Sequence, residues 1–201
     1  MKIFILIILL SLMPKYAICE KIIVDSDMTF NDAIAGSNAP DSILKTLEII
    51  SVEYYSFDGK LHRGQLVLKK QESPTIKAAF ELIKKTKFPI AKCIPIVVYN
   101  WDDDASMADN NTSMFNFRKI AGKSTLSNHS YGIAIDINPI QNPAVYNSGK
   151  VSPKGANYNI KALGTLTGSD EITLFFKSKG WRWGGDWNSL KDYQHFDSSN
   201  K

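Results

Sequence analysis

Two histidine–carboxylate pairs, far apart in the sequence, are the residues best suited to chemistry. His129 precedes Asp136 by seven positions, and Asp192 precedes His195 by three. Two imidazoles and one carboxylate can hold a zinc ion and leave a fourth position for water. A second carboxylate beside the ion can act as the base that activates this water. The four residues therefore predict an open zinc site suited to hydrolysis.

The same side chains allow a plainer interpretation. Two histidines and two aspartates are common in a chain of 201 residues, and each can be a polar side chain that is hydrogen-bonded at the surface. The spacing is also looser than the helical pattern of two histidines four residues apart that marks many zinc proteases. Spacing alone leaves both interpretations open.

Alternating isoleucines show how the first pair must be positioned. They predict a strand over 132–137 whose isoleucine side chains enter the core, which places Asp136 on the opposite face. His129 lies an odd number of residues from Asp136, so one continuous strand would direct the two side chains apart. We therefore expect His129 in a turn that bends back before the strand, with Gly132 permitting the bend.

The second pair raises the same question of strand geometry. Asp192 and His195 are three residues apart, so one strand cannot direct both side chains to one point. We expect Asp192 in the turn before a short strand that begins at His195. Asp186 is a rival for the role of base, although its glycine turn between tryptophans suits a structural hydrogen bond better.

Length and composition indicate one globular domain. The chain has 201 residues, of which 44% are hydrophobic and 22% charged, and this composition suits a domain that buries a core. A net charge of +4 is too small for a dedicated nucleic-acid binder, which needs a concentrated basic face. No repeat or linker divides the sequence. We expect a monomer with a single α+β domain, a small and mostly antiparallel sheet flanked by helices.

The first 19 residues resemble a secretory signal peptide. Lys2 provides the positive start, 3–13 is an apolar run, and Ala17 and Cys19 are small residues suited to cleavage before residue 20. The run is shorter than the roughly 20 apolar residues that cross a bilayer. We expect export to the periplasm or the extracellular space, no membrane span after cleavage, and a mature domain over 20–201.

The rest of the chain alternates predicted strands, turns and helices. We expect a hairpin of 49–57 and 65–68 around Asp58-Gly59, and further strands over 94–99, 181–183 and 195–196. We expect a short helix from Asp41, a helix from Ser73-Pro74 to Lys85 capped by Ser73, and a helix over 170–179 capped by Ser169. A polar loop at 102–104 and a long loop over 141–160 complete the expectation. Cys93 lies in an apolar stretch, so we expect a buried and inert thiol.

Several motifs in this order resemble one known family, the zinc D-alanyl-D-alanine carboxypeptidases and L-alanyl-D-glutamate endopeptidases. The family includes vancomycin-resistance-type carboxypeptidases and dipeptidases and several phage endolysins. The motifs are Ser127-x-His129-x-x-Gly132-x-Ala134-x-Asp136, Asp192-x-x-His195, Leu61-His62-Arg63-Gly64-Gln65-Leu66-Val67, Phe115-Asn116-Phe117-Arg118-x-Ile120-Ala121-Gly122 and Trp181-x-Trp183-Gly184-Gly185-Asp186-Trp187. The resemblance extends over about 61–197 and implies the fold that these peptidases share with hedgehog-type domains.

The resemblance implies a role for each of five residues. His129, Asp136 and His195 correspond to the ligands of one Zn²⁺ per chain, Asp192 to the general base, and Arg118 to the arginine that steadies the scissile carbonyl oxygen. Many members carry glutamate in place of this aspartate, although aspartate also occurs in the endopeptidase branch.

The implied activity is an exported zinc metallopeptidase that cuts peptidoglycan stem peptides with a zinc-activated water. D-alanyl-D-alanine carboxypeptidase is the first expectation. An L-alanyl-D-glutamate-type endopeptidase is the second, and a non-catalytic zinc domain of the same fold is the third.

Some roles stay open on the residues alone. Without the resemblance, Arg118 would be assigned to a surface salt bridge with the acidic run 102–104. Ser127 either binds a substrate carboxylate or caps the turn of His129. His62 is expected to be structural, hydrogen-bonded to a backbone group. The tryptophans at 181–187 are expected to pack in the core or to form the wall of a cleft.

Overall fold

The structure, a computed structural model, describes residues 21–199, so the expected signal segment lies outside it. The fold is α+β, as predicted, but its strands form four small sheets instead of one. The helices are α1 (Phe30–Ala33), α2 (Asp41–Leu44), α3 (Ser73–Thr86), α4 (Asp103–Ala108) and α5 (Glu171–Ser178). The strands are β1 (Ile23–Val24), β2 (Leu47–Tyr55), β3 (Leu61–Lys69), β4 (Lys92–Cys93), β5 (Asn111–Thr112), β6 (Ala134–Asp136), β7 (Ala144–Tyr146), β8 (Val151–Ser152), β9 (Arg182–Trp183), β10 (Leu190–Asp192) and β11 (His195–Asp197).

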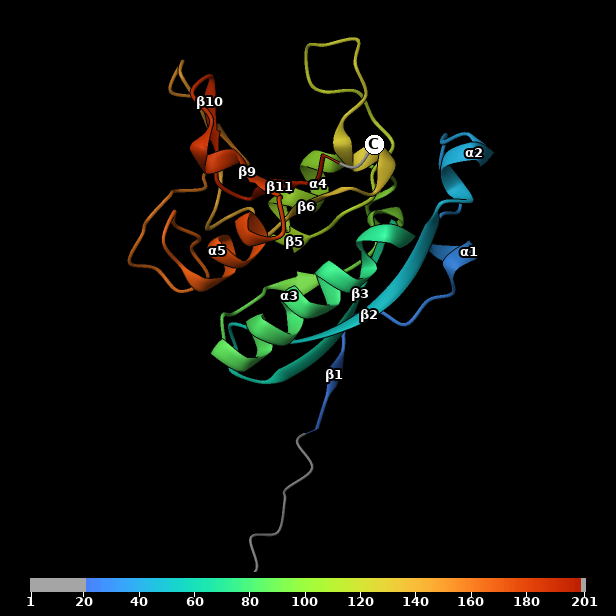
Figure 1. The fold of residues 1–201 in the computed structure, drawn as a ribbon, viewed down its shortest axis with the longest axis horizontal. Helices are drawn as coiled ribbons and strands as arrows, with labels where there is room; N and C mark the ends of the chain where they lie inside the picture. Colours follow the sequence, from blue (N-terminus) through green and yellow to red (C-terminus); the bar gives the residue numbers. More distant parts are fainter. Residues whose placement is uncertain (1–20, 200–201) are drawn as a thin grey trace, which may run out of the picture.

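The long hairpin of β2 and β3 forms one side of the molecule (Figure 1). Its antiparallel register runs from the pair Leu47–Lys69 to the pair Tyr55–Leu61. Gly59 turns the chain with a φ of +76°, which confirms the predicted turn at Asp58-Gly59. β1 extends this sheet as a parallel neighbour of β3.

Helix α3 covers the hairpin because one of its faces is apolar (Figure 1). Ile76, Ala79, Phe80 and Ile83 recur at helical spacing and are at most 3% exposed. The helix ends at Lys87, whose φ of +54° is left-handed. The expected serine cap is wrong by one position, since the residue that precedes the helix is a glutamate and Ser73 is already helical.

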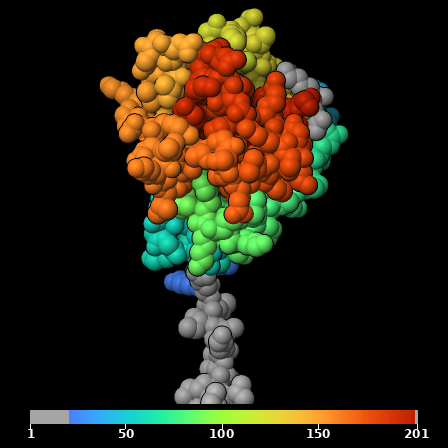
Figure 2. Space-filling view, turned by 60° about the vertical axis from the view of Figure 1, so that its left-hand side comes forward, coloured from blue at the N-terminus to red at the C-terminus, as the bar shows by residue number. Residues whose placement is uncertain are grey.

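A second sheet, β6–β11–β9, forms the floor of the candidate site. β11 lies at its centre and is antiparallel to both neighbours. Ile133, Ile135 and Ile137 are 0% exposed, which confirms that they enter the core. Phe196 of β11 is also fully buried and stacks on Phe176 of α5, with ring centroids 4.5 Å apart. Figure 2 shows the C-terminal segments gathered above the part of the molecule that α3 and the hairpin form.

Two segments differ from the sequence-based expectation. The predicted strand over 94–99 is wrong, because only β4 pairs and a 3₁₀ helix follows at Ile96–Tyr99. Pro95 has no N–H to offer a strand partner, which explains the early end of the pairing. The expected loop over 141–160 contains the hairpin β7–β8, and β7 also pairs with β10.

Helix caps account for the other differences. Asp170, not Ser169, caps α5, because its side chain accepts hydrogen bonds from the N–H groups of residues 172 and 173. The acidic run expected to be a loop starts α4, with Asp102 as its cap. α2 begins after Pro40 and is only four residues long.

No helix within residues 21–199 is long and apolar enough to cross a membrane.

Cys93 is buried, as expected from the apolar stretch around it. Cys93, at the end of β4, is 0% exposed and free. Burial raises the pKa of its thiol well above the ordinary value, which keeps the thiol protonated and inert.

Gly132 provides a first test of the fold. Its φ is +64°, and a Cβ would lie 2.6 Å from the backbone nitrogen of Lys69 and 2.9 Å from Leu47. We expect Gly132→Ala to lower the free energy of unfolding by roughly 2 to 5 kcal/mol, because the cost of an alanine in the left-handed conformation and the cost of the steric clash add to each other. Gly149→Ala is the control, with a φ of +82° and nothing within 4 Å.

Urea unfolding of metal-free protein measures both variants. The control should lose only roughly 1 to 2 kcal/mol, the cost of a left-handed non-glycine residue. Equal losses in the two variants would contradict the clash with the β2–β3 hairpin.

Candidate metal centre

Three side chains distant in the sequence converge in the interior. His129 Nε2 lies 3.2 Å from Asp136 Oδ2, and His195 Nδ1 lies 2.9 Å from Asp136 Oδ1. The two imidazole nitrogens are 3.2 Å apart. All three residues are at most 8% exposed, and the candidate ligand atoms lie within 4.8 Å of one another. The structure thus places together the three residues that the sequence nominated as metal ligands.

Local structure directs each of these side chains. His129 belongs to a 3₁₀ helix at Asn128–Tyr131, and Gly132 ends it in a left-handed conformation. The expected turn before the strand is therefore correct. Ser127 caps this turn, since its Oγ accepts a hydrogen bond from the His129 N–H at 3.3 Å. Asp136 and His195 stand directly opposite each other in the β6–β11 pair, which brings their side chains within reach.

The contacts of the two imidazoles direct one ring nitrogen of each toward the centre. His129 Nδ1 lies 2.6 Å from the carbonyl oxygen of Met114. A carbonyl only accepts, so Nδ1 carries the proton and Nε2 presents a lone pair to the other two residues. His195 presents Nδ1 to the centre, and its Nε2 lies 3.7 Å from Asp197 Oδ2. Such outer carboxylates fix the orientation of metal-binding histidines.

The charges at the centre favour a cation. Burial opposes an ionised Asp136, but His129 and His195 outweigh it and hold the pKa of this carboxyl well below its ordinary value. Burial also opposes a charged His195, yet the carboxylates of Asp136 and Asp197 outweigh it and raise its pKa to about 10. The carboxylates of Asp136 and Asp197 therefore favour a positive charge at this buried site. Two imidazole nitrogens and a carboxylate oxygen are a donor set that fits zinc.

Asp192 is half-buried beside this centre at the end of β10. Burial raises its pKa to about 6, with His195 opposing the shift and Asp136 adding to it. Its Oδ1 is buried and has no hydrogen-bond partner within residues 21–199. A buried acceptor without a donor is what a carboxylate that binds a water or a substrate leaves in the protein alone.

The expected turn around Asp192 is wrong, because the residue belongs to a strand. It pairs with Ala144 of β7, and the turn comes after it, at residues 193–194. Gly184 allows this placement, since a Cβ there would lie 2.3 Å from the Asp192 carbonyl oxygen and 2.9 Å from its Cβ. The glycine pair after Trp183 therefore lets the strand of the candidate base approach the rest of the site.

Arg118 was expected either to form a salt bridge with the acidic run 102–104 or to serve the reaction at the centre, and its contacts are compatible with both. Its Nη2 lies 2.8 Å from Asp103 Oδ2, so the ion pair with the acidic run exists. Its backbone is also tied to the turn of His129, because its N–H donates to Ser130 Oγ at 2.9 Å and its carbonyl accepts from the same hydroxyl at 2.7 Å. Its Nε is buried and has no partner in the described part of the chain.

Sequence reasoning missed Tyr146. In the β7–β10 pair this tyrosine lies two residues beyond the partner of Asp192, on the same face of the sheet. Burial and Asp192 raise the pKa of Tyr146, and Arg118 opposes the shift. The phenol is therefore within electrostatic reach of both candidate catalytic groups. Because the sequence indicated a loop over 141–160, it gave no reason to place Tyr146 on a strand beside Asp192.

The tryptophans divide between the two expected places. Trp181 and Trp183 are each 4% exposed and belong to the main core. Trp187 lies at the centre instead, with its ring centroid 5.2 Å from that of His195. It forms a wall beside the candidate metal ligands.

Two other nominated side chains lie elsewhere. His62 binds carboxylates instead of the expected backbone group, with Nδ1 2.9 Å from Asp25 and Nε2 3.2 Å from Asp58. Asp186 is exposed and pairs with Lys177 at 2.7 Å, so it has no place in the centre.

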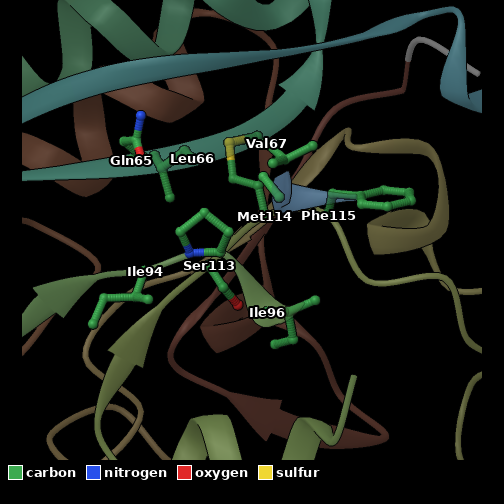
Figure 3. A pocket seen from close by; sticks show the side chains of 10 residues that line it. Gln65, Leu66, Val67, Ile94, Ile96, Ser113, Met114 and Phe115 are labelled. Carbon is green, nitrogen blue, oxygen red and sulfur yellow. The ribbon is translucent and has the colours of Figure 1, made fainter. Parts of the chain in front are cut away.

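A small cavity lies between β3 and the segments at 94–96 and 113–115 (Figure 3). Its volume of about 10 Å³ suits a single water molecule at most. It is lined by Ala33, Gln65, Leu66, Val67, Ile94, Pro95, Ile96, Ser113, Met114 and Phe115. None of the metal-ligand candidates lines it, so it carries no role in the chemistry of the centre.

Comparison with known proteins supports the expected family. Residues 121–198 match the family model described as D-alanyl-D-alanine carboxypeptidase. This segment includes the three converging residues and Asp192 and begins after Arg118. No solved structure gives a significant match. The family resemblance expected from the sequence is thus confirmed for the segment that carries the metal centre, and the chain is similar there to D-alanyl-D-alanine carboxypeptidases.

Proposed function

We propose that this protein is an exported zinc peptidase that hydrolyses peptide bonds in peptidoglycan stem peptides. D-alanyl-D-alanine carboxypeptidase is the activity that we propose ahead of the alternatives below. The convergence of His129, Asp136 and His195 beside the half-buried Asp192 carries the proposal. The family match over 121–198 supports a peptidase of this kind. Export rests on the signal-like segment 1–19.

Each residue has a defined part in this reaction. His129 Nε2, His195 Nδ1 and the Asp136 carboxylate would hold the zinc ion, which when bound supplies Lewis acidity and lowers the pKa of a coordinated water to roughly 7. Asp192 takes a proton from the attacking water and returns it to the leaving amine. Arg118 stays charged and donates hydrogen bonds to the carbonyl oxygen as negative charge develops there.

Two alternatives share the same centre. An L-alanyl-D-glutamate-type endopeptidase is favoured by the aspartate at 192, a residue that resembles the endopeptidase branch. A non-catalytic zinc domain would need neither a base nor an arginine beside the metal. Asp192 Oδ1 and Arg118 Nε, which have no hydrogen-bond partner among residues 21–199, favour catalysis over this last alternative.

Purified muropeptides test the proposal directly. Zinc-loaded protein is incubated with them, and the products are identified by mass spectrometry, with chelator-treated protein as the control. Release of a terminal D-alanine supports the carboxypeptidase, and a cut within the stem supports the endopeptidase. Unchanged muropeptides would contradict both and favour the non-catalytic domain.

The pH dependence of the reaction follows from Asp192. Burial raises its pKa to about 6, with His195 opposing and Asp136 adding, and only the ionised carboxylate accepts a proton. A metal cation favours the ionised form, so we expect kcat/KM to fall by about tenfold per pH unit below a midpoint at or below that value. Zinc content measured at each pH separates this loss from loss of the metal. A flat profile down to pH 4 with zinc retained would rule out Asp192 as the base.

A further inference from the structure

One carboxylate outside the centre contacts the segment that carries Arg118. Asp103 lies in the first turn of α4, and each of its oxygens has a partner. Oδ2 binds Arg118 Nη2 at 2.8 Å, and Oδ1 accepts a hydrogen bond from Asn116 Nδ2 at 3.1 Å. The segment over 116–118 is thus held by its side chains from α4.

The same segment is held by its backbone from the metal-binding turn. The Asn116 N–H donates to the carbonyl of His129 at 3.1 Å, and Ser130 Oγ bridges the N–H and carbonyl of Arg118. α4 in turn lies beside the strands of the centre (Figure 1), with Met107 Sδ 3.5 Å from Gln194 Nε2. Arg118 is therefore fixed at both ends, its backbone by the turn and its guanidinium by Asp103.

Stability alone does not account for this ion pair. The side chains of Arg118 and Asp103 are 29% and 26% exposed, and ion pairs that contact water to this degree contribute little to stability. Orientation is the larger effect, since an arginine side chain has several rotatable bonds and a misplacement of about 1 Å can cost roughly a hundredfold in rate.

We propose that Asp103 is a positioning residue that fixes the Arg118 guanidinium for its part in the hydrolysis. The inference rests on the proposed function. Asp103 binds Nη2 of Arg118, which leaves Nη1 to donate to a carbonyl oxygen. The hydrogen bond from Asn116 Nδ2 to the other oxygen of Asp103 keeps the carboxylate from turning away.

Asp103→Asn tests the proposal by kinetics. Arg118 and Asn116 face different oxygens of Asp103, and the amide is uncharged and keeps an oxygen at only one of these positions, so the charge-assisted contact to Arg118 and the acceptor for Asn116 are not both preserved. We expect kcat to fall roughly 10- to 100-fold, with KM and zinc content unchanged. Asp104→Asn is the matched control, because it makes the same change at the next residue of α4, which is exposed, and should keep full activity.

A double-mutant cycle shows whether Asp103 acts through Arg118. In an Arg118→Ala background, Asp103→Asn should have no further effect on kcat. An equal fall in both backgrounds, or a fall as small as that of Asp104→Asn, would overturn the proposal.

A second measurement needs no activity. The chain has three arginines, so its spectrum contains three arginine Nε–H signals, and Arg118→Lys assigns one of them. The ¹⁵N–¹H nuclear Overhauser effect of this signal should drop in Asp103→Asn and stay unchanged in Asp104→Asn. An unchanged effect in Asp103→Asn would refute the positioning role. Intact muropeptides with the wild-type protein would count against the proposed function alone, since this measurement still decides whether Asp103 holds Arg118.

Discussion

Asp192→Asn should lower kcat by roughly 10²- to 10⁴-fold, the contribution of a general base, while zinc remains bound. The amide has nearly the same shape as the carboxylate but cannot take a proton. The loss should be large because Asp192 Oδ1 is buried with no partner in residues 21–199, and its pKa of about 6 places proton transfer near neutral pH. Steady-state kinetics on muropeptides and zinc content measured together test this expectation.

Asp186→Asn provides the matched control for this variant. It makes the same chemical change in the other aspartate considered as a base, and that residue pairs with Lys177 at the surface. We expect its activity to match the wild type. Near-full activity in Asp192→Asn, or a comparable loss in Asp186→Asn, would show that the base is assigned wrongly.

His129→Ala should weaken zinc binding by more than roughly 100-fold, the upper end of the loss for outer residues around a metal, and should reduce hydrolysis to background. The alanine removes one of the two imidazole nitrogens that face Asp136. It also leaves the carbonyl of Met114 without its donor. Competition with a fluorescent zinc chelator measures the affinity.

The third histidine provides the control for metal binding. His62→Ala makes the same substitution at a residue that binds Asp25 and Asp58, away from the centre. It should keep the zinc affinity of the wild type. Wild-type affinity in His129→Ala, or an equal loss in His62→Ala, would contradict the proposed ligand set.

Strand periodicity predicted the first half of the centre. The alternation of Ile133, Ile135 and Ile137 fixes the face of Asp136, and the odd spacing requires the turn that carries His129. These features depend on neighbours in the sequence, so the sequence alone is sufficient to infer them.

Contacts between distant segments were not predictable in this way. Asp192 belongs to a strand because Ala144 pairs with it, and the segment of that partner shows no periodicity. Asp103 looks like part of a solvated loop until Arg118 and Asn116 fold against it. Pro95 shows the opposite error, where β-branched residues favour a strand and one missing donor prevents it.

The β6–β11 pair has two faces with different tasks. Ile135 pairs with Phe196 in the core, while Asp136 pairs with His195 at the centre. Because side chains alternate along strands, a slip of one strand by one residue would turn its polar side chain into the apolar core and its apolar side chains toward the candidate centre. Core packing and metal binding therefore select the same register. A chain that takes up the metal has by that fact aligned its two ligand strands, and metal uptake during refolding reports the moment of correct pairing.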